Sequence, residues 1–207
     1  MGSIFPSPSM QNIRPLVAEL LGTFLLALLV HVSLKAGFPL ATPVVAGLTL
    51  GLVVYMLGSI SGAHVNPAVT IGLFSIGKIQ MMDAVSYIVA QFIGGALALV
   101  VGNALLGTSP SLVVGDSAMI VMAEALGAAI LVLGVSSVVH GKAPHDAAGL
   151  TIGGALLLGV LAASTQSNGV LNPAVALGIG SVSLSYIAGP VIGGVLAAWG
   201  YRWLVKA

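Results

Sequence analysis

Two Asn-Pro-Ala triplets are the polar groups in this chain whose type and spacing could act on a ligand. Asparagine is a favoured N-cap, and proline suits the first position of a helix, where no N–H bond is lost. Each triplet therefore predicts a helix start whose backbone and side-chain N–H groups can donate hydrogen bonds to a passing oxygen. The six residues are Asn66, Pro67, Ala68, Asn172, Pro173 and Ala174.

Other kinds of chemistry find little support in the sequence. We see no nucleophile beside a base, no metal-ligand cluster and no cofactor loop, so we expect no enzyme, no metal and no cofactor. The chain has no cysteine, and its net charge is only +1. It has no basic patch interleaved with aromatic residues, so we expect no nucleic-acid partner.

The composition predicts a membrane protein. Of the 207 residues, 58% are hydrophobic and 5% are charged, whereas soluble domains have about 25% charged residues. So few charges cannot cover a water-facing surface, and we expect the lipid bilayer to surround the chain.

Six apolar segments are long enough to cross a bilayer. A helix needs about 20 residues to span the hydrocarbon core, and the candidates contain the glycines that are common in membrane helices. The predicted spans are about 15–37, 42–61, 83–106, 118–139, 147–165 and 183–205.

Two further apolar segments are only half as long. They run from Asn66 to Gly77 and from Asn172 to Gly180, which is about 15 Å of helix each. A polar, glycine-containing stretch precedes each one, at 58–65 and 164–171. Such backbone is tolerated at membrane depth only where protein buries it or a watery cavity hydrates it. The pair therefore predicts a pore or an internal site.

The chain contains an internal repeat. Residues 17–30 resemble 122–135, and 87–98 resemble 186–197, in the same order as the triplets. Each copy has three full spans, so the second copy is inserted upside down and the two half-helices meet near the midplane. We expect a short tail, 1–14, and one channel domain, 15–207, with repeat one about 15–106 and repeat two about 118–205.

The positive charges predict the orientation. One side of the predicted topology holds Arg14, Lys78, Lys142, Arg202 and Lys206, and the other holds Lys35. Because cytoplasmic ends carry the excess of Lys and Arg, we expect both termini to be cytoplasmic.

The motifs "AELLGTF", "SGAHVNPAVT", "AQFIGGALA", "AEALGAAI", "LNPAVALG" and "GPVIGGVLA" resemble those of the aquaporin, or major intrinsic protein, family over about residues 15–205. The resemblance implies an all-α membrane protein, with six transmembrane helices and two re-entrant half-helices in an inverted repeat. It also implies a pore in each subunit, a homotetramer and an integral, multi-pass protein of the plasma membrane.

The resemblance places a selectivity constriction by counting from the triplets. The four positions are occupied here by Ala46, Val160, Gly169 and Val175. The family nearly always has arginine where Val175 stands, and arginine would supply donors, charge and bulk. We therefore expect a wider, more apolar ring that passes water and small uncharged solutes such as glycerol, ammonia or hydrogen peroxide. We expect ions to be excluded, with cations repelled mainly by the half-helix dipoles.

Three further residues belong to the predicted site. Glu19 and Glu124 are carboxylates inside predicted spans, and the resemblance implies that each supports the loop before a half-helix. His64 is expected beside the pore. A proton-relay role for the carboxylates would instead make the chain a coupled secondary transporter, and a structural or adhesive membrane protein is a third possibility.

Overall fold

The computed structural model describes residues 13–37 and 39–206, so the predicted tail 1–14 lies almost wholly outside the described part of the chain. Within those residues the chain is helical and contains no strand. The elements are α1 Arg14–Ala36, α2 Thr42–Ser61, α3 Pro67–Ser75, α4 Met81–Leu106, α5 Ala118–Val139, a 3-10 turn η1 His145–Ala147, α6 Ala148–Ala163, α7 Pro173–Ile179 and α8 Ser185–Val205.

The helix boundaries agree closely with the predicted spans and half-spans. α2 and α5 begin and end at the predicted residues. The fifth span differs most, because it opens with the turn η1 and its α-helix ends at Ala163, before a turn that covers 164–166.

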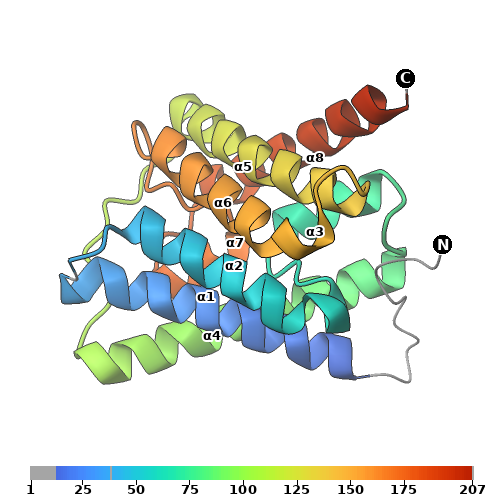
Figure 1. Cartoon of the computed structure of the whole chain (residues 1–207). Coiled ribbons are helices and arrows are strands. Elements are labelled where there is room, and N and C mark those ends of the chain that lie inside the picture. The colour runs from blue at the N-terminus through green and yellow to red at the C-terminus, as the bar shows by residue number, and fades with distance from the viewer. Residues whose placement is uncertain (1–12, 38, 207) are drawn as a thin grey trace.

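The long helices form a bundle with the short α3 and α7 between them, and α1 begins at the end of the bundle where α8 ends (Figure 1). α3 packs mainly against α8, and α7 packs mainly against α4. Each half-helix therefore leans on the last long helix of the other repeat, so the two repeats interlock.

Glycines allow the long helices to touch backbone to backbone. A Cβ atom on Gly153 of α6 would lie 2.4 Å from the carbonyl oxygen of Gly47 on α2, and one on Gly51 would lie 2.9 Å from that of Gly149. Small residues at such crossings are typical of membrane helix pairs, where close packing replaces the hydrophobic effect as the driving force.

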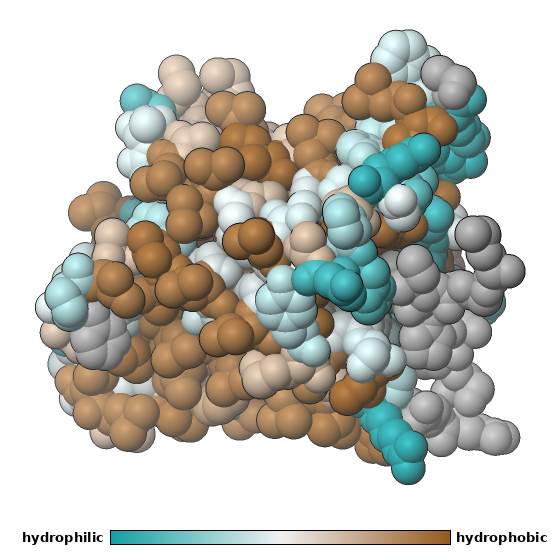
Figure 2. Space-filling view, viewed as in Figure 1, coloured by the Kyte–Doolittle hydropathy of each residue, from teal (hydrophilic) through white to brown (hydrophobic). Residues whose placement is uncertain are grey.

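The outer surface of the bundle is apolar. Figure 2 shows a broad hydrophobic face, with hydrophilic residues gathered mostly toward the end where α1 begins. Large side chains such as Leu52, Leu150 and Leu196 are more than half exposed on the long helices. A soluble protein rarely exposes so large an apolar surface, so the bundle is an integral membrane protein.

Among the described residues, five helices are long and apolar enough to cross a membrane: α1, α2, α4, α5 and His145–Ala163. α8, the sixth predicted span, has 21 residues but is not one of the five. Pro190, Arg202 and several glycines lower its mean hydropathy. Its length nevertheless matches the other long helices.

Candidate functional site

The two triplets begin α3 and α7, and their asparagines cap these helices. The side-chain oxygen of Asn66 accepts a bond from the backbone N–H of Ala68 at 2.8 Å. That of Asn172 accepts from Ala174 at 3.0 Å and from Val175 at 3.2 Å. Each asparagine therefore satisfies N–H groups that have no partner inside a helix.

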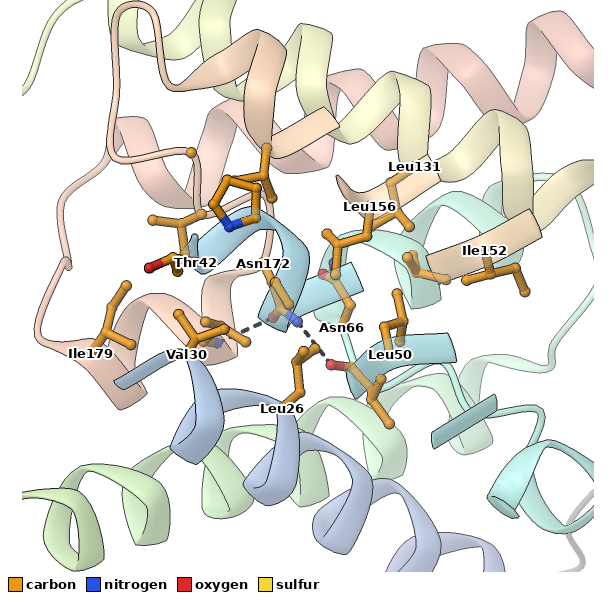
Figure 3. Close-up of a pocket in the computed structure, with 18 of the residues that line it drawn as sticks. Leu26, Val30, Thr42, Leu50, Asn66, Leu131, Ile152, Leu156, Asn172 and Ile179 are labelled. Atoms are coloured by element: carbon orange, nitrogen blue, oxygen red, sulfur yellow. Dashed lines mark hydrogen bonds between the residues drawn. The ribbon is translucent and has the colours of Figure 1, made fainter. Parts of the chain in front are cut away.

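The same two asparagines tie the half-helices to each other. The amide nitrogen of Asn66 donates to the carbonyl of Leu171 at 2.9 Å, and that of Asn172 donates to the carbonyl of Val65 at 2.9 Å. Both side chains line one cavity, and Figure 3 shows them near its middle. Each amide has two N–H groups, so one on each side remains for a molecule in the cavity.

The carbonyls that accept these bonds are presented by unusual backbone. Val65 has φ 42° and Leu171 has φ 57°, a left-handed region that non-glycine residues seldom adopt and that is especially unfavourable for β-branched valine. Such conformations persist only where the surroundings impose them.

Glu19 supplies part of that restraint in the first repeat. It is fully buried on α1, where an ionised carboxylate is tolerated only if it is well hydrogen-bonded. One carboxylate oxygen accepts from the hydroxyl of Ser61 at 2.7 Å and the N–H of His64 at 2.9 Å, and the other accepts from the N–H of Val65 at 2.6 Å and the amide of Gln91 at 2.8 Å.

Glu124 repeats the arrangement on α5, and it too is fully buried. Its carboxylate accepts from the hydroxyl of Ser167 at 2.7 Å and from the N–H groups of Val170 and Leu171 at 2.9 and 2.6 Å. Pro190 occupies the repeat position of Gln91 and has no side-chain donor. The two loops are thus built on one plan with different side-chain partners.

His64 lines the cavity, and its neighbours decide which ring nitrogen holds the proton. The hydroxyl of Thr70 donates to the carbonyl of Asn66 at 3.1 Å and accepts from the amide of Gln91 at 3.0 Å. Its oxygen lies 3.2 Å from Nδ1 of His64, and with the hydroxyl proton directed to Asn66, Nδ1 donates that bond. In the neutral ring, Nε2 is then an acceptor. The ring packs edge-on against Tyr87.

The cavity around the asparagines has mostly aliphatic walls. Its volume is about 140 Å³, and a single water needs only about 10–15 Å³ of such space. All four residues of the predicted constriction line it, whereas the prolines and alanines of the triplets are buried behind the asparagines. Figure 3 shows the main aliphatic side chains: Leu26, Val30, Leu50, Leu131, Leu156 and Ile179.

A second cavity, of about 420 Å³, adjoins the first. Its walls include Tyr55, His145 and Asp146, and it shares His64 and four neighbouring residues with the first cavity. The first cavity extends the other way, to Thr42. We call the two extremes the Thr42 end and the His145 end.

Toward the Thr42 end the side-chain donors of Asn168 and Ser164 are already used, whereas the hydroxyl of Thr42 accepts from Ser33 at 3.2 Å. The amide of Asn168 donates to the carbonyl of Val113 at 3.2 Å and the hydroxyl of Ser181 at 2.8 Å. The hydroxyl of Ser164 donates to the carbonyl of Val160 at 2.7 Å. Asn168 and Ser164 therefore offer a passing molecule acceptors more than donors.

Sequence reasoning missed the side chains that complete the loop supports. Thr70 joins His64 to Gln91, and the hydroxyl of Tyr87 donates to the carbonyl of Ser61 at 2.8 Å. The repeat itself carried a signal, because a serine stands five residues before each triplet and a tyrosine opens each matching stretch of the third span. Among the described residues, no group of three or more His, Cys, Asp or Glu side chains could hold a metal ion.

Comparison with known proteins places this architecture in a family. The model of the major intrinsic protein family matches residues 6–201. A probable aquaporin AqpM of Archaeoglobus fulgidus is 37% identical over 183 residues, which are 77% of this chain and 74% of that protein. A glycerol uptake facilitator protein-like 6 of Lactiplantibacillus plantarum is 37% identical over 90% of this chain and 95% of that protein.

A plant aquaporin and a solved aquaglyceroporin structure are also similar to this chain. Aquaporin NIP1-1 of Zea mays is 33% identical over 94% of this chain and 76% of that protein. The fold resembles the X-ray structure of the aquaglyceroporin from Plasmodium falciparum with a TM-score of 0.71 at 21% identity, covering 93% of this chain and 96% of that one. The chain therefore belongs to the major intrinsic protein family: it is an integral membrane channel for water or small solutes and not an enzyme.

Proposed function

We propose that the chain conducts water and small uncharged solutes, with glycerol, ammonia and hydrogen peroxide as candidates, and that it excludes ions. The path is the pair of adjoining cavities between the Thr42 end and the His145 end. The observation that carries the proposal is the side chain of Val175, which lines the cavity beside Asn172 and offers neither charge nor donor.

The proposed constriction consists of Ala46, Val160, Gly169 and Val175, and its shape favours solutes larger than water. A Cβ atom on Gly169 would lie 2.5 Å from the hydroxyl oxygen of Ser164 and 3.2 Å from Cγ1 of Val160. The space beside Val160 therefore exists only because position 169 has no side chain. With valine in place of the family's arginine, the ring is both wider and less polar.

The polar groups along the path suit solutes that both donate and accept hydrogen bonds. Asn168 and Ser164 offer acceptors toward the Thr42 end, the two asparagine amides each offer an N–H group at the middle, and Nε2 of His64 offers an acceptor beyond them. Hydroxyl, amine and peroxide groups can use both kinds of partner. Each contact replaces part of the hydration that the solute loses on entry.

Exclusion of ions follows from the same walls. Among the described residues that line the first cavity there is no Asp, Glu, Lys or Arg. An ion entering this apolar space would lose hydration without gaining a counter-charge, which is costly. The asparagine N–H groups at the middle add a barrier to cations.

The sharpest test is Val175→Arg in reconstituted proteoliposomes, followed by stopped-flow light scattering. We expect glycerol permeability to fall by about tenfold, equivalent to a barrier increase of about 1.4 kcal/mol, and water permeability to fall less. Val182→Arg is the matched control, since Val182 is exposed and does not line the cavity. Unchanged glycerol flux in a folded Val175→Arg protein would show that Val175 does not line the constriction.

Two further measurements separate the alternative functions. A potassium gradient clamped with valinomycin, read with a voltage-sensitive dye, tests ion exclusion. Saturable uptake that requires a proton or sodium gradient would favour a secondary transporter. Absence of water and solute flux in folded protein would favour a structural or adhesive role.

We also propose that the channel domain is a homotetramer in the plasma membrane with both termini cytoplasmic. Arg14 and Arg202 lie near the start of α1 and the end of α8, at one end of the bundle, and Lys35 lies in the last turn of α1. Because the chain has no cysteine, Lys206→Cys provides a unique label. Reaction with an impermeant maleimide in intact cells would contradict the orientation, and native mass spectrometry tests the tetramer.

A further inference from the structure

His31 is a histidine that the channel path does not use. It lies on α1, is fully buried, and its Nδ1 is 2.9 Å from the carbonyl oxygen of Gly178. A carbonyl can only accept, so Nδ1 must donate. Gly178 is in the last turn of α7, where carbonyls have no partner within the helix. The imidazole therefore closes the carboxyl end of a half-helix from a different element.

The other half-helix closes itself. The carbonyl of Gly72, which stands in α3 where Gly178 stands in α7, accepts from the hydroxyl of Ser75 at 2.7 Å. The serine at the matching place after α7 is Ser181, and its hydroxyl oxygen bonds the amide of Asn168 instead. α7 thus depends on α1 for a bond that α3 makes internally.

The surroundings of His31 are specific to the first repeat. A Cβ atom on Gly102 of α4 would lie 2.8 Å from the imidazole ring, so only glycine leaves room for it. The repeat offsets that pair Glu19 with Glu124 and Tyr87 with Tyr186 pair His31 with Ser136 and Gly102 with Tyr201. The large and small side chains have exchanged places, which shows that the fold does not itself require an imidazole here.

The bond joins two walls of the first cavity. Val30 and Leu34 flank His31 on α1 and line the cavity, and Ile179, next to Gly178, lines it from α7 (Figure 3). We propose that His31 is a positioning residue that fixes the spacing between α1 and α7 beside Val175, and so tunes which solutes pass. This inference rests on the proposed function, in which solutes pass Val175.

The test compares His31→Leu, which removes the donor, with His31→Asn, whose amide nitrogen can take the place of Nδ1. Proteoliposome flux gives the ratio of glycerol to water permeability. We expect His31→Leu to change that ratio by roughly fivefold, the factor that one hydrogen bond carries in an equilibrium, and His31→Asn to stay near the unsubstituted protein. His140→Leu is the control, since His140 bonds the carbonyl of Ser136 on its own helix and lines neither cavity.

A second variant covers the case in which His31→Leu does not fold. Gly102→Ala keeps His31 in the sequence, but the added methyl group displaces its ring from the carbonyl of Gly178. We expect the same change in the permeability ratio. An unchanged ratio in folded His31→Leu, or in Gly102→Ala when the leucine variant does not fold, would overturn the proposal.

A distance measurement separates this inference from the proposed function. Spin labels at Lys35→Cys and Val182→Cys, both exposed positions, report the separation of the α1 end from the segment after α7 by pulsed EPR. We expect a broader distance distribution in His31→Leu than in His31→Asn, whether or not glycerol is a substrate. An identical distribution in the two variants would overturn the positioning role even if the channel conducts as proposed.

Discussion

The same hydrogen-bonded loop occurs twice, before Asn66 and before Asn172, and the two copies differ. In both, a buried carboxylate accepts a serine hydroxyl and two backbone N–H groups. The first carboxylate also accepts a hydrogen bond from the amide of Gln91, which donates a second bond to the hydroxyl of Thr70. The second carboxylate has no such amide partner, because a proline stands where Gln91 would be.

The difference indicates which parts of the repeat can change. The carboxylate and the crossed asparagine bonds occur in both copies, because each loop must present its carbonyl from strained backbone. The surrounding partners vary, and the loop that includes Gly169 and leads to Val175 is the one whose carboxylate has no glutamine partner. This loop is held instead by bonds of Asn168 to Tyr186 and Ser181.

The largest expected effect comes from neutralising the two carboxylates separately. Whichever way an amide is placed at Glu124, its NH₂ group faces donors, and we expect Glu124→Gln to lower the free energy of unfolding by about 4 kcal/mol. At Glu19 the cost should be about 2 kcal/mol, because Gln91 can turn and offer its own oxygen, which is buried without a partner. Thermal unfolding of the detergent-solubilised variants measures both.

The informative result is which of the two variants, Glu124→Gln or Glu19→Gln, loses more unfolding free energy. Equal losses would show that Gln91 does not adapt, and a larger loss for Glu19→Gln would reverse the interpretation of the fourth bond. The triple comparison with Glu19→Gln in a Gln91→Leu background isolates the contribution of Gln91.

The contacts of the half-helices with the opposite repeat provide the next comparison. A Cβ atom on Gly95 would lie 2.2 Å from the carbonyl oxygen of Ala174, and one on Gly194 would lie 2.9 Å from that of Ala68. We expect Gly95→Ala to cost about 3 kcal/mol and Gly194→Ala about 1 kcal/mol, because the closer contact at Gly95 requires the larger shift of backbone. Gly154→Ala, which meets nothing within 4 Å, is the control for both unfolding curves.

Removing Gln91 should make the first loop resemble the second. Gln91→Leu deletes one bond to Glu19 and one to Thr70, and it also removes the buried oxygen that has no partner. We expect a loss of about 1–2 kcal/mol in unfolding free energy with little change in water permeability. A strong loss of water flux in folded protein would show that Gln91 acts on the path and not only on the loop.

The smallest effect concerns the helix that follows each half-helix. At the start of α8, the carboxylate of Asp116 accepts hydrogen bonds from the hydroxyl and the N–H of Ser185. At the start of α4, the N-cap residue Gln80 makes no side-chain cap bond. The bonds from Ser185 hold the pKa of Asp116 below its ordinary value of 3.8. This stabilisation is present above the pKa of the unfolded chain and is lost as pH falls through the lower pKa of the folded chain.

Asp116→Asn is therefore expected to unfold at a slightly lower temperature than the unsubstituted protein near neutral pH. The difference should shrink as the pH falls through the lowered pKa of Asp116, because the carboxyl group of the unsubstituted protein then also becomes protonated. A difference that stays constant with pH would mean that the charge on Asp116 contributes nothing.

Much of the fold could be predicted because the governing signals are local. Apolar runs of bilayer length located the long helices, and the Asn-Pro starts located α3 and α7 to within two residues at their ends. The repeat then implied that the half-helices meet. α8 was found by length and position although Pro190 and Arg202 weaken its apolar character.

The candidate site was predictable only where the repeat or the family resemblance carried a signal. Asn66, Asn172, His64 and the four proposed constriction residues do line one cavity. Thr70 was missed because a threonine inside a half-helix has no distinctive spacing. His31 has no distinctive signal in the sequence, because its partner, Gly178, is 147 residues away.

The sequence by itself determined that this chain crosses a membrane in an inverted repeat with two capped half-helices, since hydropathy, helix capping and repetition act over short stretches. Only the tertiary structure decided which groups meet across the repeats: the crossed asparagine bonds, the unequal supports of the two carboxylates and the contact between His31 and Gly178. These depend on helices packed backbone to backbone through glycine, a geometry that no local pattern specifies.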